Sequence, residues 1–189
     1  MKKTKWVLAI IGFIVLLLIC SILYQNLRED YTNQQAKKTN VEENIQEGNT
    51  NKKQAKNFTI YDEQGNALHL SDFAGKGIVI NVWTTWCGYC KEEMPYFDKL
   101  YQENKDNVHF LMVNVLDGGT ESVENGIAYR NGQGYSFPIY FDKEFNLIYS
   151  YQLTGYPNTI FIDKDGNLED IHYGLITEEQ LKEGIEKIK

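Results

Sequence analysis

Apolar and polar residues divide the chain into three parts. Residues 6–24, "WVLAIIGFIVLLLICSILY", carry no charged side chain, residues 25–57 are polar with mixed charge, and residues 58–189 alternate short apolar runs with polar turns. A helix formed by the first run, at about 1.5 Å per residue, approaches the roughly 30 Å hydrocarbon core of a bilayer. The pattern therefore predicts a transmembrane anchor at 6–24, a flexible linker at 25–57 and a folded domain at 58–189.

Lysines among residues 1–5 set the orientation of the predicted anchor. This excess of positive charge places the N-terminus in the cytoplasm and the rest of the chain outside it. A cleaved signal peptide is one alternative, although the apolar run exceeds the usual 7–15 residues and no clear A-x-A site follows. Lipid attachment at Cys20 is another, although the bulky Ile19 before it argues against this. All three readings make the domain extracytoplasmic.

Short β-branched runs alternate with amphipathic segments along residues 58–189, which predicts an α/β domain. The expected strands are a hairpin in 58–70 about Gln64-Gly65-Asn66, single strands at 77–83, 108–115 and 137–142, and a hairpin in 158–174 about Asp165-Gly166. The expected helices are 91–104, 120–133, 143–153 and 177–188. Thr177 and Gln180 have the spacing of a capping box at the start of the last helix. This order predicts a central mixed β-sheet flanked by helices.

Composition removes some classes of function. Asp and Glu number 26 against 19 Lys and Arg, a net charge of −7, so the chain lacks the basic footprint of a nucleic-acid-binding protein. Aromatic residues make up 13%, which favours a packed core over a disordered chain. Nothing in the sequence indicates an interface between copies, and we expect a monomer.

Two of the three cysteines, Cys87 and Cys90, form a C-x-x-C pair, and the third, Cys20, lies in the apolar run. A disulfide between residues three positions apart closes almost no loop, which disfavours a purely structural bridge. A structural zinc site needs four ligands, usually as two pairs, and the sequence has no second C-x-x-C. The pair is therefore predicted to be a redox couple, with no metal.

The predicted elements place this pair between a buried strand and a helix. Cys87 would then lie near the helix N-terminus, where free backbone N–H groups and the helix dipole stabilise a thiolate. Cys90 would lie one turn later on the same face, buried. We expect Cys87 to attack a disulfide and Cys90 to resolve the resulting mixed disulfide.

The stretch "VWTTWCGYC" at residues 82–90, with Pro95 after it, resembles the thioredoxin superfamily. More narrowly, it is similar to the TlpA/ResA-like group of membrane-anchored, extracytoplasmic thiol–disulfide oxidoreductases, over residues 57–189. The resemblance implies a thioredoxin-like fold, with a central mixed β-sheet flanked by helices, an N-terminal β-hairpin and an inserted helix at 120–133.

The resemblance also implies further site residues. Superfamily members hold the proline matching Pro157 in cis, which would present the Tyr156 backbone to an extended substrate; the alternative is an ordinary loop proline. Glu93 matches an acidic residue of the ResA-like group, whereas Asn81 stands where thioredoxins carry Asp. A partly buried Glu93 would have a raised pKa and exchange the proton of Cys90; the alternative is a solvated helix charge.

Residues around the two cysteines complete the predicted substrate-binding surface. Trp86 is expected to pack over the thiol, and Gly88 and Tyr89 form the variable dipeptide that tunes the reduction potential. With Tyr156 and Pro157 they would contact the substrate. We expect no cofactor beyond the Cys87–Cys90 disulfide.

The function that the resemblance implies is reduction of disulfides in exported proteins, with apocytochrome c or an exported methionine sulfoxide reductase as candidate clients. Electrons would come from a membrane partner of the CcdA/DsbD type. A disulfide-forming oxidase of the same fold is the first alternative. A thiol peroxidase is more remote: Thr84 has the right spacing to Cys87, but Ile80 replaces the proline of that family. The intact cysteine pair argues against a non-catalytic binding module.

Overall fold

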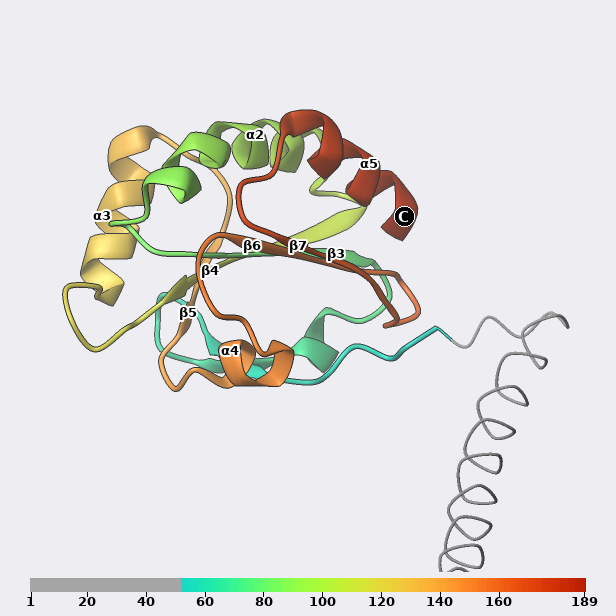
Figure 1. Cartoon of the computed structure of the whole chain (residues 1–189), viewed down its shortest axis with the longest axis horizontal. Helices are drawn as coiled ribbons and strands as arrows, with labels where there is room; N and C mark the ends of the chain where they lie inside the picture. Colours follow the sequence, from blue (N-terminus) through green and yellow to red (C-terminus); the bar gives the residue numbers. More distant parts are fainter. Residues whose placement is uncertain (1–51) are drawn as a thin grey trace, which may run out of the picture. The chain divides into compact units, whose positions relative to one another are not determined.

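The computed structural model describes residues 52–189, which form a seven-stranded mixed sheet with helices on both faces (Figure 1). This agrees with the predicted sheet-and-helix architecture. The predicted anchor at 6–24 and residues 25–51 of the predicted linker lie outside the described residues. Within residues 52–189, no helix is both long enough and apolar enough to cross a bilayer.

The sheet has the strand order β2-β1-β5-β4-β3-β6-β7. Strands β3, β4 and β5 run parallel, and the remaining pairings are antiparallel. The strands are β1 Thr59–Tyr61, β2 Ala67–His69, β3 Gly77–Trp83, β4 Val108–Val115, β5 Ile139–Asp142, β6 Asn158–Ile162 and β7 Leu168–Tyr173. The helices are η2 Leu70–Phe73, α2 Gly88–Asn104, α3 Val123–Gln133, α4 Asn146–Tyr151 and α5 Glu178–Ile188. Helices α2 and α5 cover one face, and α4 lies on the other (Figure 1).

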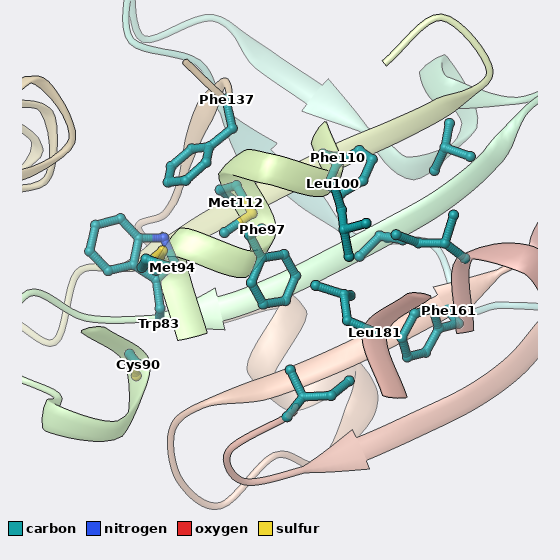
Figure 2. Packing of buried hydrophobic residues seen from close by; sticks show 14 of the residues in the cluster. Trp83, Cys90, Met94, Phe97, Leu100, Phe110, Met112, Phe137, Phe161 and Leu181 are labelled. Atoms are coloured by element: carbon teal, nitrogen blue, oxygen red, sulfur yellow. The ribbon is translucent and has the colours of Figure 1, made fainter. Parts of the chain in front are cut away.

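Strand β3 lies between β4 and β6 and is buried along its whole length. Because successive side chains of a strand point to opposite faces, β3 serves two cores. Val79 and Trp83 join the cluster beneath α2 and α5 (Figure 2), whereas Ile80 and Val82 join the cluster on the α4 side. The same alternation places Asn81 on the α2 face, where a polar side chain needs a partner.

Residues 52–57, the last part of the predicted linker, lie against the turn between β6 and β7. The Leu168 N–H donates to the Lys53 carbonyl at 2.8 Å, and the Ala55 N–H donates to the Gly166 carbonyl at 2.9 Å. The Lys52 ammonium lies 3.0 Å from the Asp163 carboxylate. These contacts are made by backbone groups of a polar segment, so they produce no periodic pattern of apolar residues. The sequence pattern therefore did not indicate them.

The helix ends show how local backbone geometry refines the predicted bounds. Helix α2 begins at Gly88, with Cys87 as its N-cap. Thr177 and Gln180 form the predicted capping box of α5. Helix α4 is shorter than the predicted 143–153, because the residues at its two ends, Phe145 and Gln152, have φ angles of 57° and 55° and leave the helical conformation.

Helix α5 packs closely on the sheet at Gly184, which predicts sensitivity to an added methyl group. A Cβ on Gly184 would lie 2.3 Å from the ring of the buried Phe161. We expect Gly184→Ala to lower the free energy of unfolding by about 1–3 kcal/mol, as overpacking does in cores. Urea denaturation measures this change.

Gly132→Ala is the matched control. It lies in α3, and a Cβ there meets nothing within 4 Å among the described residues. Helix propensity alone should raise the unfolding free energy, by up to about 1 kcal/mol. Equal effects of the two substitutions would contradict the close packing of α5 on Phe161.

Candidate active site

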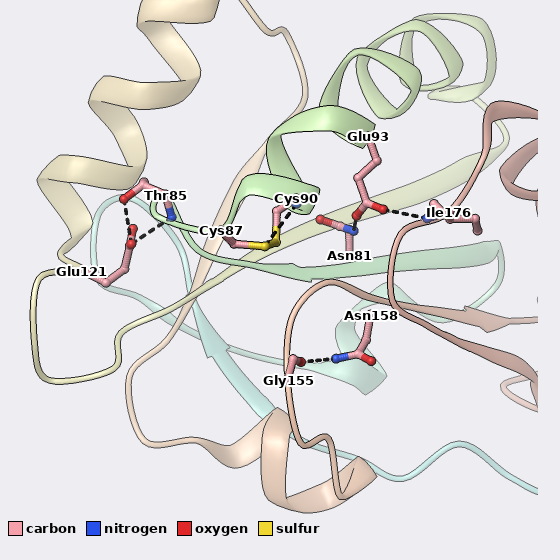
Figure 3. Close-up of a disulfide and its surroundings, with 9 residues drawn as sticks. All are labelled: Asn81, Thr85, Cys87, Cys90, Glu93, Glu121, Gly155, Asn158 and Ile176. Carbon is pink, nitrogen blue, oxygen red and sulfur yellow. Dashed lines mark hydrogen bonds between the residues drawn. A yellow bond between two sulfur atoms is a disulfide. The ribbon is translucent and has the colours of Figure 1, made fainter.

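A disulfide joins Cys87 and Cys90 where β3 leads into α2 (Figure 3). The Cys90 backbone N–H points at the Cys87 sulfur at 3.1 Å. This is the predicted geometry, in which a free N–H of the first helical turn faces the first cysteine. Such a donor stabilises negative charge on that sulfur once the disulfide opens.

The two cysteines differ in how far solvent reaches them. Cys87 is 6% exposed, whereas Cys90, in the first turn of α2, is 0% exposed. An attacking thiolate must reach a substrate sulfur, and a resolving thiol must reach only its partner. The exposures therefore suit the predicted roles of Cys87 as nucleophile and Cys90 as resolving thiol.

Glu93 is fully buried one turn after Cys90, so it is not the solvated helix charge of the alternative reading. Its two oxygens accept hydrogen bonds from Asn81 Nδ2 at 2.6 Å and from the Ile176 N–H at 3.0 Å. Burial raises the pKa of Glu93 to about 7, and these two hydrogen bonds oppose the shift only in part. Glu93 can therefore gain or lose a proton near neutral pH.

Asn81 of β3 lies next to Glu93 (Figure 3). Its Nδ2 donates to Glu93, and its buried Oδ1 has no hydrogen-bond partner among residues 52–189. An amide can turn about its terminal bond and exchange donor for acceptor. Asn81 can thus donate to an ionised Glu93 or accept from a protonated one.

Aromatic side chains surround the cysteine pair. Trp86 is half exposed, donates from Nε1 to Asp117 Oδ2 at 3.0 Å, and packs edge-to-face on Tyr156 with ring centroids 5.8 Å apart. Tyr89 is exposed. Gly88, the first residue of α2, has open space around it within the described residues. Their roles in substrate binding stay predictions.

The Tyr156–Pro157 peptide bond is cis, as the resemblance implied. The Pro157 carbonyl accepts a hydrogen bond from the Gly174 N–H at 2.9 Å, which joins this loop to the end of β7. Burial, with nearby carboxylates including Asp117, raises the pKa of the Tyr156 hydroxyl. The structure thus brings the Trp86 and Tyr156 side chains together across two segments far apart in the sequence.

A second buried glutamate, Glu121, was not predicted from the sequence. It is 6% exposed and accepts hydrogen bonds from Thr85 and from Asn114. The one available signal was Asn114 itself, a polar residue that follows four apolar ones in the predicted buried strand 108–115. A buried amide requires a partner, but the sequence did not say which residue supplies it.

Comparisons with known proteins agree with the interpretation of this site as a redox-active cysteine pair. The family model described as Redoxin matches residues 50–185. The chain is 32% identical over 188 residues to the thiol-disulfide oxidoreductase ResA of Bacillus thuringiensis subsp. konkukian, covering 100% of this chain and 99% of that protein.

Solved structures show the same fold. A thiol:disulfide interchange protein of the thioredoxin family from Chlorobium tepidum has a TM-score of 0.64 at 20% identity, covering 75% of this chain and 99% of that one. StoA from Bacillus subtilis has a TM-score of 0.59 at 25% identity, covering 69% and 96%. The thioredoxin-like fold, the TlpA/ResA-like resemblance and the prediction of a disulfide oxidoreductase are confirmed.

The raised pKa of Glu93 predicts how stability depends on pH. The folded chain holds the Glu93 proton more tightly than the unfolded chain, in which the pKa is near 4.5. The free energy of unfolding should therefore fall as pH rises from about 4.5 through about 7, by up to about 3 kcal/mol from this group. Urea denaturation of the oxidised chain between pH 4.5 and 8 measures this slope.

Glu93→Gln should remove that part of the slope. Gln can keep one acceptor, and Asn81 can turn its unpartnered oxygen toward the new amide. Other carboxylates with shifted pKa, such as Asp142, titrate equally in both proteins, so the difference between the curves isolates Glu93. Parallel curves would show that Glu93 does not titrate in this window.

Proposed function

The chain belongs to the redoxin family, and we propose that it acts outside the cytoplasm as a reductase of disulfides in exported proteins. The observation that carries the proposal is the buried Glu93, one turn after the buried Cys90. A carboxyl group whose pKa is about 7 is matched to proton exchange at neutral pH. It supplies the proton acceptor that the resolving thiol requires.

In the proposed cycle, the reduced pair gives two electrons to a client disulfide. The Cys87 thiolate attacks one client sulfur, a Cys87–client disulfide forms, and the other client sulfur leaves as a thiolate. The Glu93 carboxylate takes the Cys90 proton. The Cys90 thiolate then attacks the Cys87 sulfur and releases the second client sulfur. The client is released as two thiolates, which take protons from Glu93 and from water to give a dithiol, and the chain ends with the Cys87–Cys90 disulfide that it holds here.

The direction of electron flow depends on which state of the pair its surroundings stabilise. Strong oxidants of this fold stabilise their reduced form. Here Cys90 is buried next to an acidic side chain, Glu93, and both burial and negative charge disfavour a thiolate. The reduced pair therefore gains no stabilisation from a thiolate at Cys90, which favours donation of electrons over their capture.

The proposed partners follow from this role. A reductase outside the cytoplasm must be re-reduced there, and we assign that step to a membrane electron donor of the CcdA/DsbD type. Clients of the proposed class are apocytochrome c, whose C-x-x-C-H cysteines must be reduced for haem attachment, and exported methionine sulfoxide reductases. The apolar run at 6–24 would hold a monomeric chain at the membrane.

The reduction potential separates the reductase from the oxidase alternative. Equilibration of the full chain with defined ratios of reduced and oxidised glutathione should give a potential nearer to the roughly −270 mV of thioredoxin than to the roughly −120 mV of a strong oxidase. Cys20→Ser leaves the pair as the only cysteines. A reduction potential of about −120 mV would contradict the reductase proposal.

Trapping of mixed disulfides tests whether Cys87 is the nucleophile and Cys90 the resolving thiol. The full chain with Cys90→Ser should accumulate disulfide-linked clients through Cys87, because nothing resolves them. The matched control, Cys87→Ser, should trap far fewer, since Cys90 is 0% exposed. Non-reducing electrophoresis with mass spectrometry identifies the adducts. Equal trapping by both variants would contradict the assignment of Cys87 as nucleophile.

A further inference from the structure

Glu121 is a buried carboxylate that the cycle above does not use. It lies between β4 and α3, where Oε2 accepts hydrogen bonds from the Thr85 N–H at 2.8 Å and from Thr85 Oγ1 at 2.7 Å (Figure 3). Oε1 accepts from Asn114 Nδ2 at 2.9 Å. Both oxygens thus act as acceptors of hydrogen bonds, which is the pattern of an ionised carboxylate.

The residues that Glu121 and its neighbour hold come immediately before the nucleophile. Thr85 is two residues before Cys87, and Trp86, which donates to Asp117, is one residue before it. Glu121 and Asp117 belong to the same segment, and the Asp117 carboxylate accepts from the Glu121 N–H at 3.4 Å. One segment outside the C-x-x-C stretch therefore holds the turn from which Cys87 projects.

We propose that Glu121 is a positioning residue for the redox pair: it fixes the turn before Cys87, and its buried negative charge disfavours the Cys87 thiolate and so the reduced form. This inference deepens the proposed function and rests on it, because it names the group that makes the pair a stronger reductant. A buried charge is screened by salt much less than an exposed one.

Other charged groups face the pair and define what Glu121 adds. The N-terminus of α2 favours the thiolate. Glu93, on α2, is buried on the Cys90 side, and Lys91 lies over the Tyr129 ring at 5.6 Å from its centroid. Beyond burial, the negative charges of Asp117, Asp142 and Glu121 contribute to the raised pKa of the Tyr156 hydroxyl. The negative charge of these carboxylates is therefore felt at Tyr156, whose ring packs on Trp86.

Glu121→Gln removes the charge and retains the hydrogen bonds. The Gln oxygen can accept from Thr85, and its amide then faces Asn114. Asn114 Oδ1 is buried and has no hydrogen-bond partner within residues 52–189, so Asn114 can turn and accept from the new amide. The substitution therefore separates the charge of Glu121 from its contacts.

The test measures the equilibrium of the full chain with glutathione, in a Cys20→Ser background. Glu121→Gln should shift the equilibrium toward the reduced chain by about threefold to tenfold; a tenfold change corresponds to about 30 mV. The ultraviolet absorbance of the Cys87 thiolate should also appear at lower pH. The control Glu124→Gln, which removes an exposed carboxylate three residues later, should leave both unchanged.

Glu121→Asp is the second arm and keeps the charge while retracting the oxygens from Thr85. We expect its equilibrium to stay within about twofold of the unsubstituted chain, while disulfide exchange with a client slows because the turn is less well held. An unchanged equilibrium in Glu121→Gln, or an equal shift in both variants, overturns the proposal. Failure of this inference can be distinguished from failure of the reductase proposal. The Glu121 variants are compared with the unsubstituted chain, whereas the reductase proposal depends on the absolute reduction potential.

Discussion

Strand β3 imposes the constraint on which the site depends, because it is buried on both faces and leads through a short turn to the disulfide. Its neighbours β4 and β6 fix its backbone along almost its whole length, and its side chains enter both hydrophobic clusters. Helix α2 starts as soon as β3 and its short turn end. The position of Cys87 is therefore set by the most deeply packed part of the domain, which gives a reactive sulfur a rigid support.

Two buried asparagine–glutamate pairs flank the disulfide. Asn81 of β3 donates to Glu93, and Asn114 of β4 donates to Glu121. Both asparagines lie on the face of the sheet that α2 covers. The amide of each would lack a hydrogen-bond partner without the carboxylate that packs against it. The domain thus holds two buried carboxyl groups, those of Glu93 and Glu121, near the cysteine pair. Glu93 is the group that we propose exchanges the proton of the resolving thiol, and Glu121 accepts hydrogen bonds from the turn before the nucleophile.

Much of the fold could be predicted because its signals are local. The buried strand 77–83, the amphipathic last helix and its capping box all follow from the residues within each segment. The errors in bounds have local causes too, such as the positive φ angles that shorten α4. The contacts of residues 52–57 could not be predicted, because they join polar backbone to the β6–β7 turn more than a hundred residues away.

The sequence by itself determined the order of elements, the C-x-x-C pair at a strand–helix junction, and, through the family resemblance, the importance of Glu93. Only the tertiary structure decided what surrounds that pair. The Ile176 N–H reaches Glu93 across 83 positions, Thr85 reaches Glu121 across 36, and Trp86 meets Tyr156 from another loop. Hydrogen bonding and charge act over a few ångströms in space, and the spacing of residues along a chain does not specify which distant groups come that close.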